Sequence, residues 1–176
     1  YGKGLGILAQ VYSDQNRFAD AIILYEQART IYTGGGAGTS LDYATLLNSL
    51  GLCYSNLDIL DKALVHLTES LRIKKQNFGD FHPEVAAGIN NIAKVWEDNF
   101  QYDEAIRAYR YAKQILERTS GTENQQYAVV VSNLGGCYAS TPKLDSAAFF
   151  LQQALALKEK LFGTDNYAIA TTLNSL

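Results

Sequence analysis

The chain has 176 residues, a net charge of −3, and a composition that is 47% hydrophobic and 19% charged. It lacks the basic excess that is typical of a nucleic-acid binder and the roughly 18 consecutive apolar residues that a membrane-spanning helix needs. The cations Arg72, Lys74 and Lys75 are expected to lie on a solvated helix face. We therefore expect neither nucleic acid nor a membrane as a partner.

A pattern centred on Leu50, Gly51, Tyr54 and Ala63 recurs every 42 residues along the chain. Its columns are Leu8, Leu50, Ile92, Leu134 and Leu176; Ala9, Gly51, Ala93 and Gly135; Tyr12, Tyr54, Trp96 and Tyr138; and Ala21, Ala63, Ala105 and Ala147. A fixed period of this length indicates a stacked array of repeats. The repeats cover about residues 1–40, 41–82, 83–124 and 125–166, with a partial fifth at 167–176. Because no Met is present and both ends fall inside a repeat, we expect a fragment of a longer chain.

Apolar residues at helical spacing predict two helices in every repeat, here called helix A and helix B. In chain order the predicted pairs are 4–14 and 18–32, 43–55 and 61–76, 83–98 and 102–118, and 125–139 and 144–161, with a further helix A from 167. Gly79 suits the end of a helix and Pro83 the start of the next, and His82 is expected to cap or brace that loop.

The turn between helices A and B carries Asn16, Asp58, Phe100 and Pro142 in successive repeats. Asn and Asp tolerate a left-handed backbone, whereas Phe and Pro do so less readily. We therefore expect the turns at Phe100 and Pro142 to differ in shape from the other two.

The two cysteines, Cys53 and Cys137, share a repeat column with Val11 and Val95. This column is small and apolar, so each thiol is interpreted as a core residue. The cysteines lie two repeats apart, which argues against a disulfide or a shared metal. Unpaired thiols favour a reducing compartment such as the cytoplasm.

The chain resembles tetratricopeptide repeats in three features. These are the small residues of helix A and helix B, the aromatic column, and the loop segments Phe78-Gly79-Asp80-Phe81-His82-Pro83 and Phe162-Gly163-Thr164-Asp165. The segment Ile89-Asn90-Asn91-Ile92-Ala93 and the 42-residue period are similar to the kinesin light chain and nephrocystin variant. The resemblance covers the whole chain. It implies an all-α, right-handed superhelical solenoid of antiparallel helix pairs, with four repeats and the first helix of a fifth in one array.

The residues that could carry chemistry do not form a catalytic or metal-binding pattern. The glycine-rich segment 34–40 lacks the lysine of a phosphate-binding loop and is interpreted as a linker. His66 is expected to interact at the surface with Glu69, and Glu97 and Asp98 are interpreted as solvated charges at a helix end. We therefore expect no enzyme activity, no cofactor and no metal.

The resemblance implies that the A helices line a concave groove in which partners bind. The candidate groove residues are Asn48, Ser49, Leu52, Asn90, Asn91, Lys94, Ser132, Asn133 and Asn174. An Asn amide can bond both backbone groups of an extended peptide, and it can equally brace a neighbouring helix. Among basic residues only Lys3 and Lys94 stand on this face, which argues against recognition of an acidic carboxy terminus and favours an internal segment.

The predicted function is a protein-interaction scaffold that binds a peptide segment of a protein partner. One alternative is a regulatory or sensor region of a larger multidomain enzyme such as a signalling ATPase. Another is self-assembly, in which the exposed Ile169, Leu173 and Leu176 of the fifth helix A pair with a second copy as a homodimer.

Overall fold

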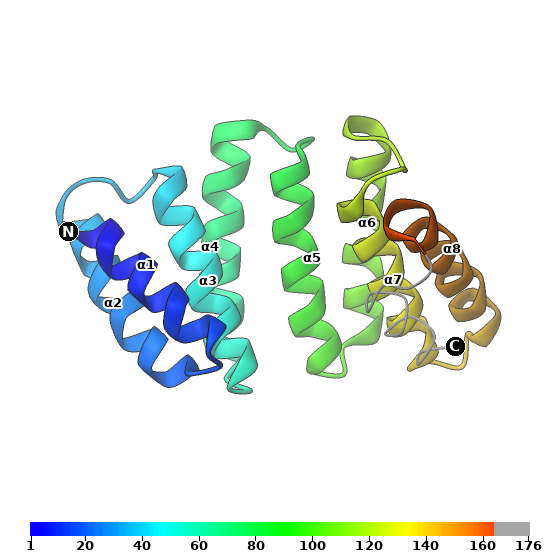
Figure 1. Cartoon of the computed structure of the whole chain (residues 1–176), viewed down its shortest axis with the longest axis horizontal. Helices are drawn as coiled ribbons and strands as arrows, with labels where there is room; N and C mark the ends of the chain where they lie inside the picture. Colours follow the sequence, from blue (N-terminus) through cyan, green and yellow to red (C-terminus); the bar gives the residue numbers. More distant parts are fainter. Residues whose placement is uncertain (164–176) are drawn as a thin grey trace. The chain divides into compact units, whose positions relative to one another are not determined.

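A computed structural model describes residues 1–163 of the chain, which form eight α-helices (Figure 1). They are α1 Gly2–Asp14, α2 Phe18–Gly34, α3 Leu41–Asn56, α4 Leu60–Phe78, α5 Pro83–Asp98, α6 Tyr102–Thr119, α7 Gln125–Ala139 and α8 Leu144–Phe162. The odd-numbered helices are the A helices and the even-numbered ones the B helices. The eight helices predicted within residues 1–163 are all present, and the all-α prediction is confirmed. The fifth helix A and the predicted homodimer contact lie outside the described residues.

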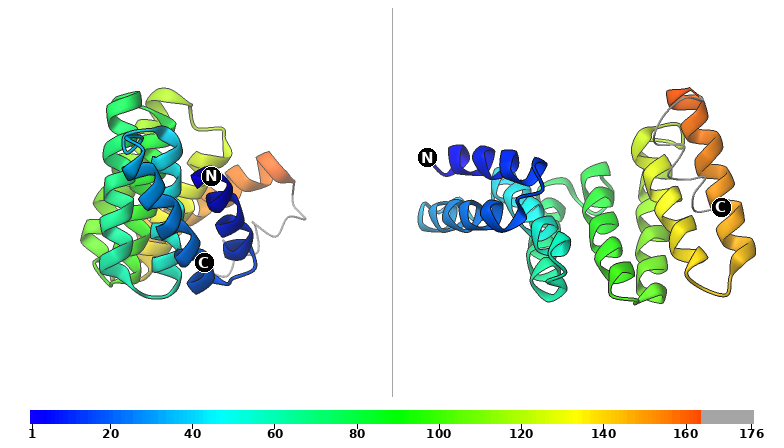
Figure 2. Two further views of the ribbon diagram at one scale, coloured as in Figure 1. Left: turned by 90° about the vertical axis from the view of Figure 1, so that its left-hand side faces the viewer. Right: turned by 60° about the horizontal axis from the view of Figure 1, so that its bottom comes forward.

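The chain divides into two compact units, Tyr1–Asp80 and Phe81–Leu176, here called unit 1 and unit 2. Unit 1 contains α1 to α4 and unit 2 contains α5 to α8, so each unit holds two described helix pairs. Within a pair, helix B runs back beside helix A, as the two views of Figure 2 show. The boundary between the units coincides with the predicted boundary between the second and third repeats.

The small repeat columns lie in the core of each unit. Ala9, Ala21, Ala63, Ala93 and Ala105 are completely buried. In unit 2, Ala93 and Ala105 pack in one buried cluster with Tyr109, Leu134 and Cys137. Cys53 and Cys137 are buried as predicted, and burial raises the pKa of Cys137 to about 12.

The A-to-B turns have the same left-handed backbone in the first three repeats, with φ of 59° at Asn16, 60° at Asp58 and 58° at Phe100. In each of these turns, the backbone N–H of the following residue donates a hydrogen bond to the backbone carbonyl of the aromatic-column residue on helix A. In the third repeat this bond runs from Gln101 to Trp96 at 2.8 Å. The expectation of a different turn at Phe100 is therefore wrong, because this shared bond pattern overrides the preference of the residue. At Pro142, where the proline ring excludes positive φ, the turn does differ: the backbone N–H of Lys143 donates to Thr141 Oγ1 at 3.3 Å, whereas its counterparts in the first three repeats donate to the carbonyl of the aromatic column.

Side chains cap the start of three A helices. Ser40, His82 and Asn124 each accept a hydrogen bond from a backbone N–H in the first turn of α3, α5 and α7. Pro83 follows His82 at the first position of α5, and Gly79 ends α4 with a φ of 79°. The capping roles predicted for His82, Pro83 and Gly79 are thus confirmed.

Candidate functional site

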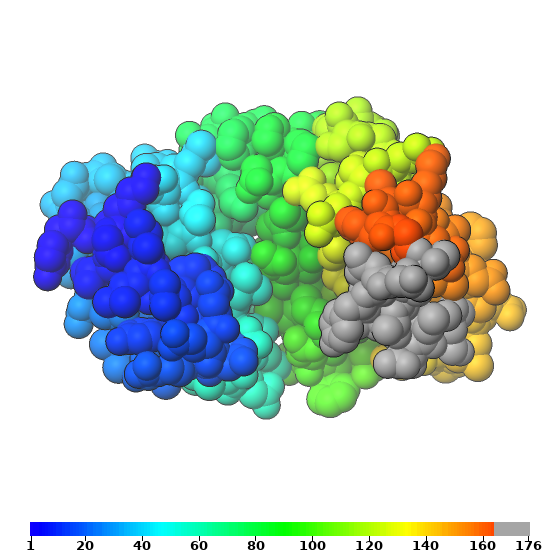
Figure 3. Space-filling view, in the orientation of Figure 1, coloured from blue at the N-terminus to red at the C-terminus, as the bar shows by residue number. Residues whose placement is uncertain are grey.

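In unit 1, α1 and α3 form a cleft with a volume of about 240 Å³, here called the α1–α3 cleft. Helix α1 is the dark blue element at the front of Figure 3. The lining of the α1–α3 cleft includes Lys3, Gln10 and Thr45, and it also includes the predicted groove residue Ser49. Gln10 Oε1 accepts a hydrogen bond from the Tyr25 hydroxyl at 2.9 Å and another from the Ser49 hydroxyl at 3.4 Å. Polar groups of neighbouring A helices are therefore in contact along this cleft.

The other two candidates of unit 1, Asn48 and Leu52, are half-buried on α3 beside Ser49. Neither belongs to the lining of the α1–α3 cleft. Of the three residues predicted in this unit, Ser49 is the one that lines the α1–α3 cleft.

In unit 2, two clefts lie along α5 and α7. The larger, of about 280 Å³, is lined by Lys94, Glu97, Val129, Ser132, Asn133, Gly136 and Lys158, and is called the lysine cleft. The smaller, of about 190 Å³, is lined by Ala87, Asn90, Asn91, Leu116, Gln125, Gln126, Val129 and Val130, and is called the amide cleft. The five candidates that lie among the described residues of this unit all line one of the two clefts.

Asn48, Asn90, Ser132 and Asn174 form one repeat column in the sequence, and Ser49, Asn91, Asn133 and Ser175 form the next. Asn133 Nδ2 donates a hydrogen bond to Asn90 Oδ1 at 3.0 Å and so joins these two columns. This bond links α7 to α5, and therefore the two repeats of unit 2. It engages one of the two polar groups of each amide. Asn174, the last predicted residue of these columns, lies outside the described residues.

Helix B also contributes to this face, which the sequence argument missed. Lys158 of α8 is 7% exposed, and its ammonium donates to the Ser132 hydroxyl at 3.1 Å in the lysine cleft. Burial lowers the pKa of Lys158. Lys74 holds the same repeat position in unit 1 and is 8% exposed, so its assignment to a solvated helix face was wrong. The sequence contained one signal for this burial, because Lys74 and Lys158 occupy a repeat column that Tyr32 and Leu116 fill in the other two repeats.

Glu97 is not the solvated helix-end charge that the sequence suggested. Its side chain is 17% exposed and accepts a hydrogen bond of 2.8 Å from the buried Tyr109 hydroxyl. Burial raises the pKa of the Glu97 carboxyl, while the bond from Tyr109 acts in the opposite direction. Lys94 pairs with Asp98 at 2.6 Å and lies 3.8 Å from Glu97. The lysine cleft therefore contains a carboxylate close to its cations.

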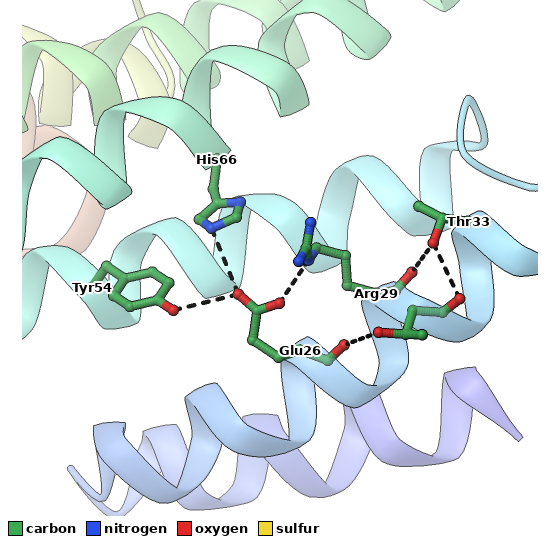
Figure 4. A network of polar contacts seen from close by, with 6 residues as sticks. Glu26, Arg29, Thr33, Tyr54 and His66 are labelled. Carbon is green, nitrogen blue, oxygen red and sulfur yellow. Dashed lines mark hydrogen bonds and ion pairs between the residues drawn. The ribbon is translucent and has the colours of Figure 1, made fainter.

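His66 also differs from expectation, because it contacts Glu26 of the preceding repeat and not Glu69 (Figure 4). His66 Nε2 lies 3.8 Å from Glu26 Oε1, and the ring stacks on Tyr54 with centroids 5.5 Å apart. Glu26 also accepts from the Tyr54 hydroxyl at 3.3 Å and from Arg29 Nε at 2.6 Å. This network ties the two repeats of unit 1 together.

Within residues 1–163, no group of three or more His, Cys, Asp or Glu side chains is placed to hold a metal ion. Over the same residues, no helix has the length and apolar character required to cross a bilayer. The glycine-rich segment joins α2 to α3, as expected of a linker.

Comparison with known proteins matches residues 4–76 and 84–160 to the tetratricopeptide repeat family. The chain is 24% identical over 165 residues to Protein KINESIN LIGHT CHAIN-RELATED 2 of Arabidopsis thaliana, covering 90% of this chain and 24% of that protein. It is 27% identical over 109 residues to the Clustered mitochondria protein homolog of Coccidioides immitis (strain RS), covering 62% of this chain and 8% of that protein. The chain thus spans a quarter or less of the length of these relatives.

Among solved structures, BtubC (BKLC) from P. vanneervenii superposes with a TM-score of 0.80 at 23% sequence identity. The superposition covers 98% of this chain and 68% of that one. This likeness confirms the helical repeat fold. The resemblance to kinesin light chains is confirmed together with the family match and the Arabidopsis thaliana relative. Repeats of this type generally mediate protein–protein interactions and form a non-enzymatic kind of scaffold. Because the family model matches most of unit 1 and most of unit 2, this chain belongs to the tetratricopeptide repeat family.

Proposed function

We propose that the A-helix faces of this chain bind an extended peptide segment of a protein partner. The observation that carries the proposal is the convergence of Asn90, Asn91, Lys94, Ser132 and Asn133 on two adjoining clefts of unit 2. These residues supply donors and acceptors beside apolar surface from Val129, which both clefts share. An extended backbone offers the complementary groups at regular intervals.

The contact between Asn133 and Asn90 supports a peptide-binding role that is combined with helix bracing. The bond occupies Asn133 Nδ2 and Asn90 Oδ1, and so fixes the orientation of both amides. Asn133 Oδ1 is an acceptor and Asn90 Nδ2 a donor, and these are the groups proposed to meet a peptide backbone. Pre-orientation lowers the entropy that a ligand must overcome on binding.

The charges of the lysine cleft favour a segment of mixed character. Two lysines and the carboxylate of Glu97 line this cleft, and Lys94 is paired with Asp98, so charges of both signs face a ligand. A short segment that is ordered on binding is expected to reach micromolar affinity, about −8 kcal/mol.

The test uses peptides selected from a random phage-displayed library against the intact chain, with dissociation constants measured by calorimetry. Replacing Asn133 by Ala removes one orienting and one contacting group. We expect Kd to rise at least about fivefold, corresponding to roughly 1 kcal/mol for a lost hydrogen bond. Asn99→Ala is the matched control, because Asn99 is exposed in the turn after α5 and its side chain bonds only Gln101 among the described residues.

A purely bracing role gives a different result. In that case Asn133→Ala lowers the unfolding temperature while every selected peptide binds with unchanged Kd. That combination would contradict the proposal.

A further inference from the structure

A larger cleft in unit 2 remains unassigned by the proposed function. It has a volume of about 550 Å³ and is lined by Arg107, Arg110, Tyr111, Lys113, Gln114 and Glu117 of α6, Tyr138 of α7 and Phe150 of α8. We call it the arginine cleft. Its lining shares no residue with the lysine cleft or the amide cleft.

One edge of the arginine cleft is basic. Arg107, Arg110 and Lys113 follow at intervals of three residues along α6 and therefore lie on one side of the helix. Arg107 pairs with Glu104 at 3.0 Å, and Lys113 with Glu117 at 2.6 Å. Arg110 is exposed, and its guanidinium forms no ion pair or hydrogen bond within residues 1–163. Its guanidinium is thus available to a ligand.

Three aromatic residues also line the cleft: Tyr111, Tyr138 and Phe150. Tyr138 and Phe150 stack in parallel, with centroids 5.6 Å apart and an angle of 4° between their planes. Tyr111 lies beside the arginines on α6, and Phe149, 62% exposed, meets Phe150 edge-on at 5.1 Å. A ligand that spans the cleft would place charged groups on one side and apolar groups on the other.

The repeat itself shows that the scaffold does not require these cations. The positions equivalent to Arg107, Arg110 and Lys113 are occupied in the other repeats by Ile23, Glu26 and Arg29, by Val65, Thr68 and Leu71, and by Phe149, Gln152 and Leu155. Only the third repeat carries three cations there. All four repeats form the same helix pair, so the basic edge is a local addition to the fold.

We propose that the arginine cleft binds an acidic segment of a protein partner. The planar guanidinium of Arg110 accommodates a carboxylate in a two-point contact, and Arg107 can exchange its exposed pair with Glu104 for a second carboxylate. The rings of Tyr138 and Phe150 take the apolar part of the same segment. This site is independent of peptide binding by the A-helix faces.

The extent of the basic edge favours an acidic peptide over a nucleic acid. The three cations occupy two turns of one helix and are flanked by Glu104 and Glu117, in a chain of net charge −3. A nucleic-acid backbone requires a basic surface that continues along several phosphates.

The test measures fluorescence anisotropy of a labelled peptide, Glu-Asp-Glu-Leu-Asp-Glu-Asp, against its uncharged analogue Gln-Asn-Gln-Leu-Asn-Gln-Asn. We expect the acidic peptide to bind at least about tenfold more tightly than the analogue, and Arg110→Glu to weaken it by about tenfold or more. Lys143→Glu is the matched control, because Lys143 is an exposed cation of unit 2 outside the cleft. That control should change Kd by less than about twofold.

Thermal melts establish that each variant is folded, and Tyr111→Ala tests the apolar side without changing charge. Equal binding of the acidic peptide by wild type and Arg110→Glu would overturn the proposal. So would tighter binding of a single-stranded oligonucleotide than of the acidic peptide. Loss of peptide binding in Asn133→Ala but not in Arg110→Glu would place the acidic segment on the A-helix face and equally refute this site.

Discussion

Phe100 holds a backbone conformation that residues with a Cβ rarely adopt. Its φ is 58°, and its side chain is 78% exposed, so packing contributes little to hold it there. The equivalent positions carry Asn16 and Asp58, whose short polar side chains favour this conformation. The residue therefore stores strain that the rest of the turn maintains.

Replacing Phe100 by Asn is expected to stabilise the chain by about 1 kcal/mol, because it removes much of the left-handed penalty. Urea unfolding followed by circular dichroism measures this gain. Phe100→Leu is the control, since it keeps the penalty and should leave stability nearly unchanged. A lower midpoint for Phe100→Asn than for wild type would contradict this explanation.

His66 gives unit 1 a pH dependence at the residue scale. Burial lowers the pKa of His66 from its ordinary 6.5, although nearby Glu26 acts to raise it. As the pH falls through 6.5, the unfolded chain binds this proton before the folded one does. The contribution of His66 to stability is therefore present above that pH and is lost as the pH falls towards the folded pKa.

We expect the free energy of unfolding of wild type to fall relative to that of His66→Phe as the pH is lowered from about 7.5 to about 5.5. Phe retains the stacking on Tyr54 but cannot take up a proton. Comparing the two proteins removes the effect of Glu97, whose raised pKa acts in the opposite direction in both. Identical pH profiles would show that His66 is not the responsible group.

At the scale of the helix, the repeat column of small residues is matched to its partner on helix B. Gly51 and Gly135 occur in the repeats that carry Leu67 and Leu151, whereas Ala9 and Ala93 occur in those that carry Tyr25 and Tyr109. A Cβ on Gly135 would lie 2.9 Å from Leu151 Cγ and 3.0 Å from the Leu151 backbone nitrogen. The branched leucine occupies space that a flat tyrosine ring leaves open.

The adjacent glycines of α7 should respond to alanine with opposite signs. Gly135→Ala is expected to destabilise by roughly 1–3 kcal/mol through overpacking against α8. Gly136→Ala is expected to stabilise by about 0.5–1 kcal/mol, because a Cβ there meets nothing within 4 Å and alanine favours the helix. Both values follow from urea unfolding. The same sign for both variants would refute the proposed packing.

The positions of the helices were predicted correctly from the sequence, whereas several contacts between helices were not. The 42-residue columns located all eight described helices because core packing repeats with the same period. The burial of Lys74 and Lys158, and the contact between His66 and Glu26, depend on a neighbouring helix or repeat and leave only weak signals in that period. The turn at Phe100 was missed because backbone hydrogen bonds overrule residue preference there.

For the molecule as a whole, we propose that ligand recognition depends mainly on residues outside the buried repeat columns. The buried columns recur in all four sequence repeats, while the residues that line the clefts differ from one repeat to the next. The lysine cleft and the amide cleft contain the predicted groove residues among the described residues of unit 2, and the arginine cleft contains three cations that occur together only in the third repeat. The central claim is that a peptide contacts the asparagine amides at the first two clefts.

The most direct measurement records the side-chain amide resonances of ¹⁵N-labelled protein during titration with a selected peptide. Binding is predicted to shift the resonances of Asn90, Asn91 and Asn133 progressively, with the same midpoint as the calorimetric Kd, and to leave Asn99 unchanged. Saturating peptide that leaves those three amides unshifted would contradict the account.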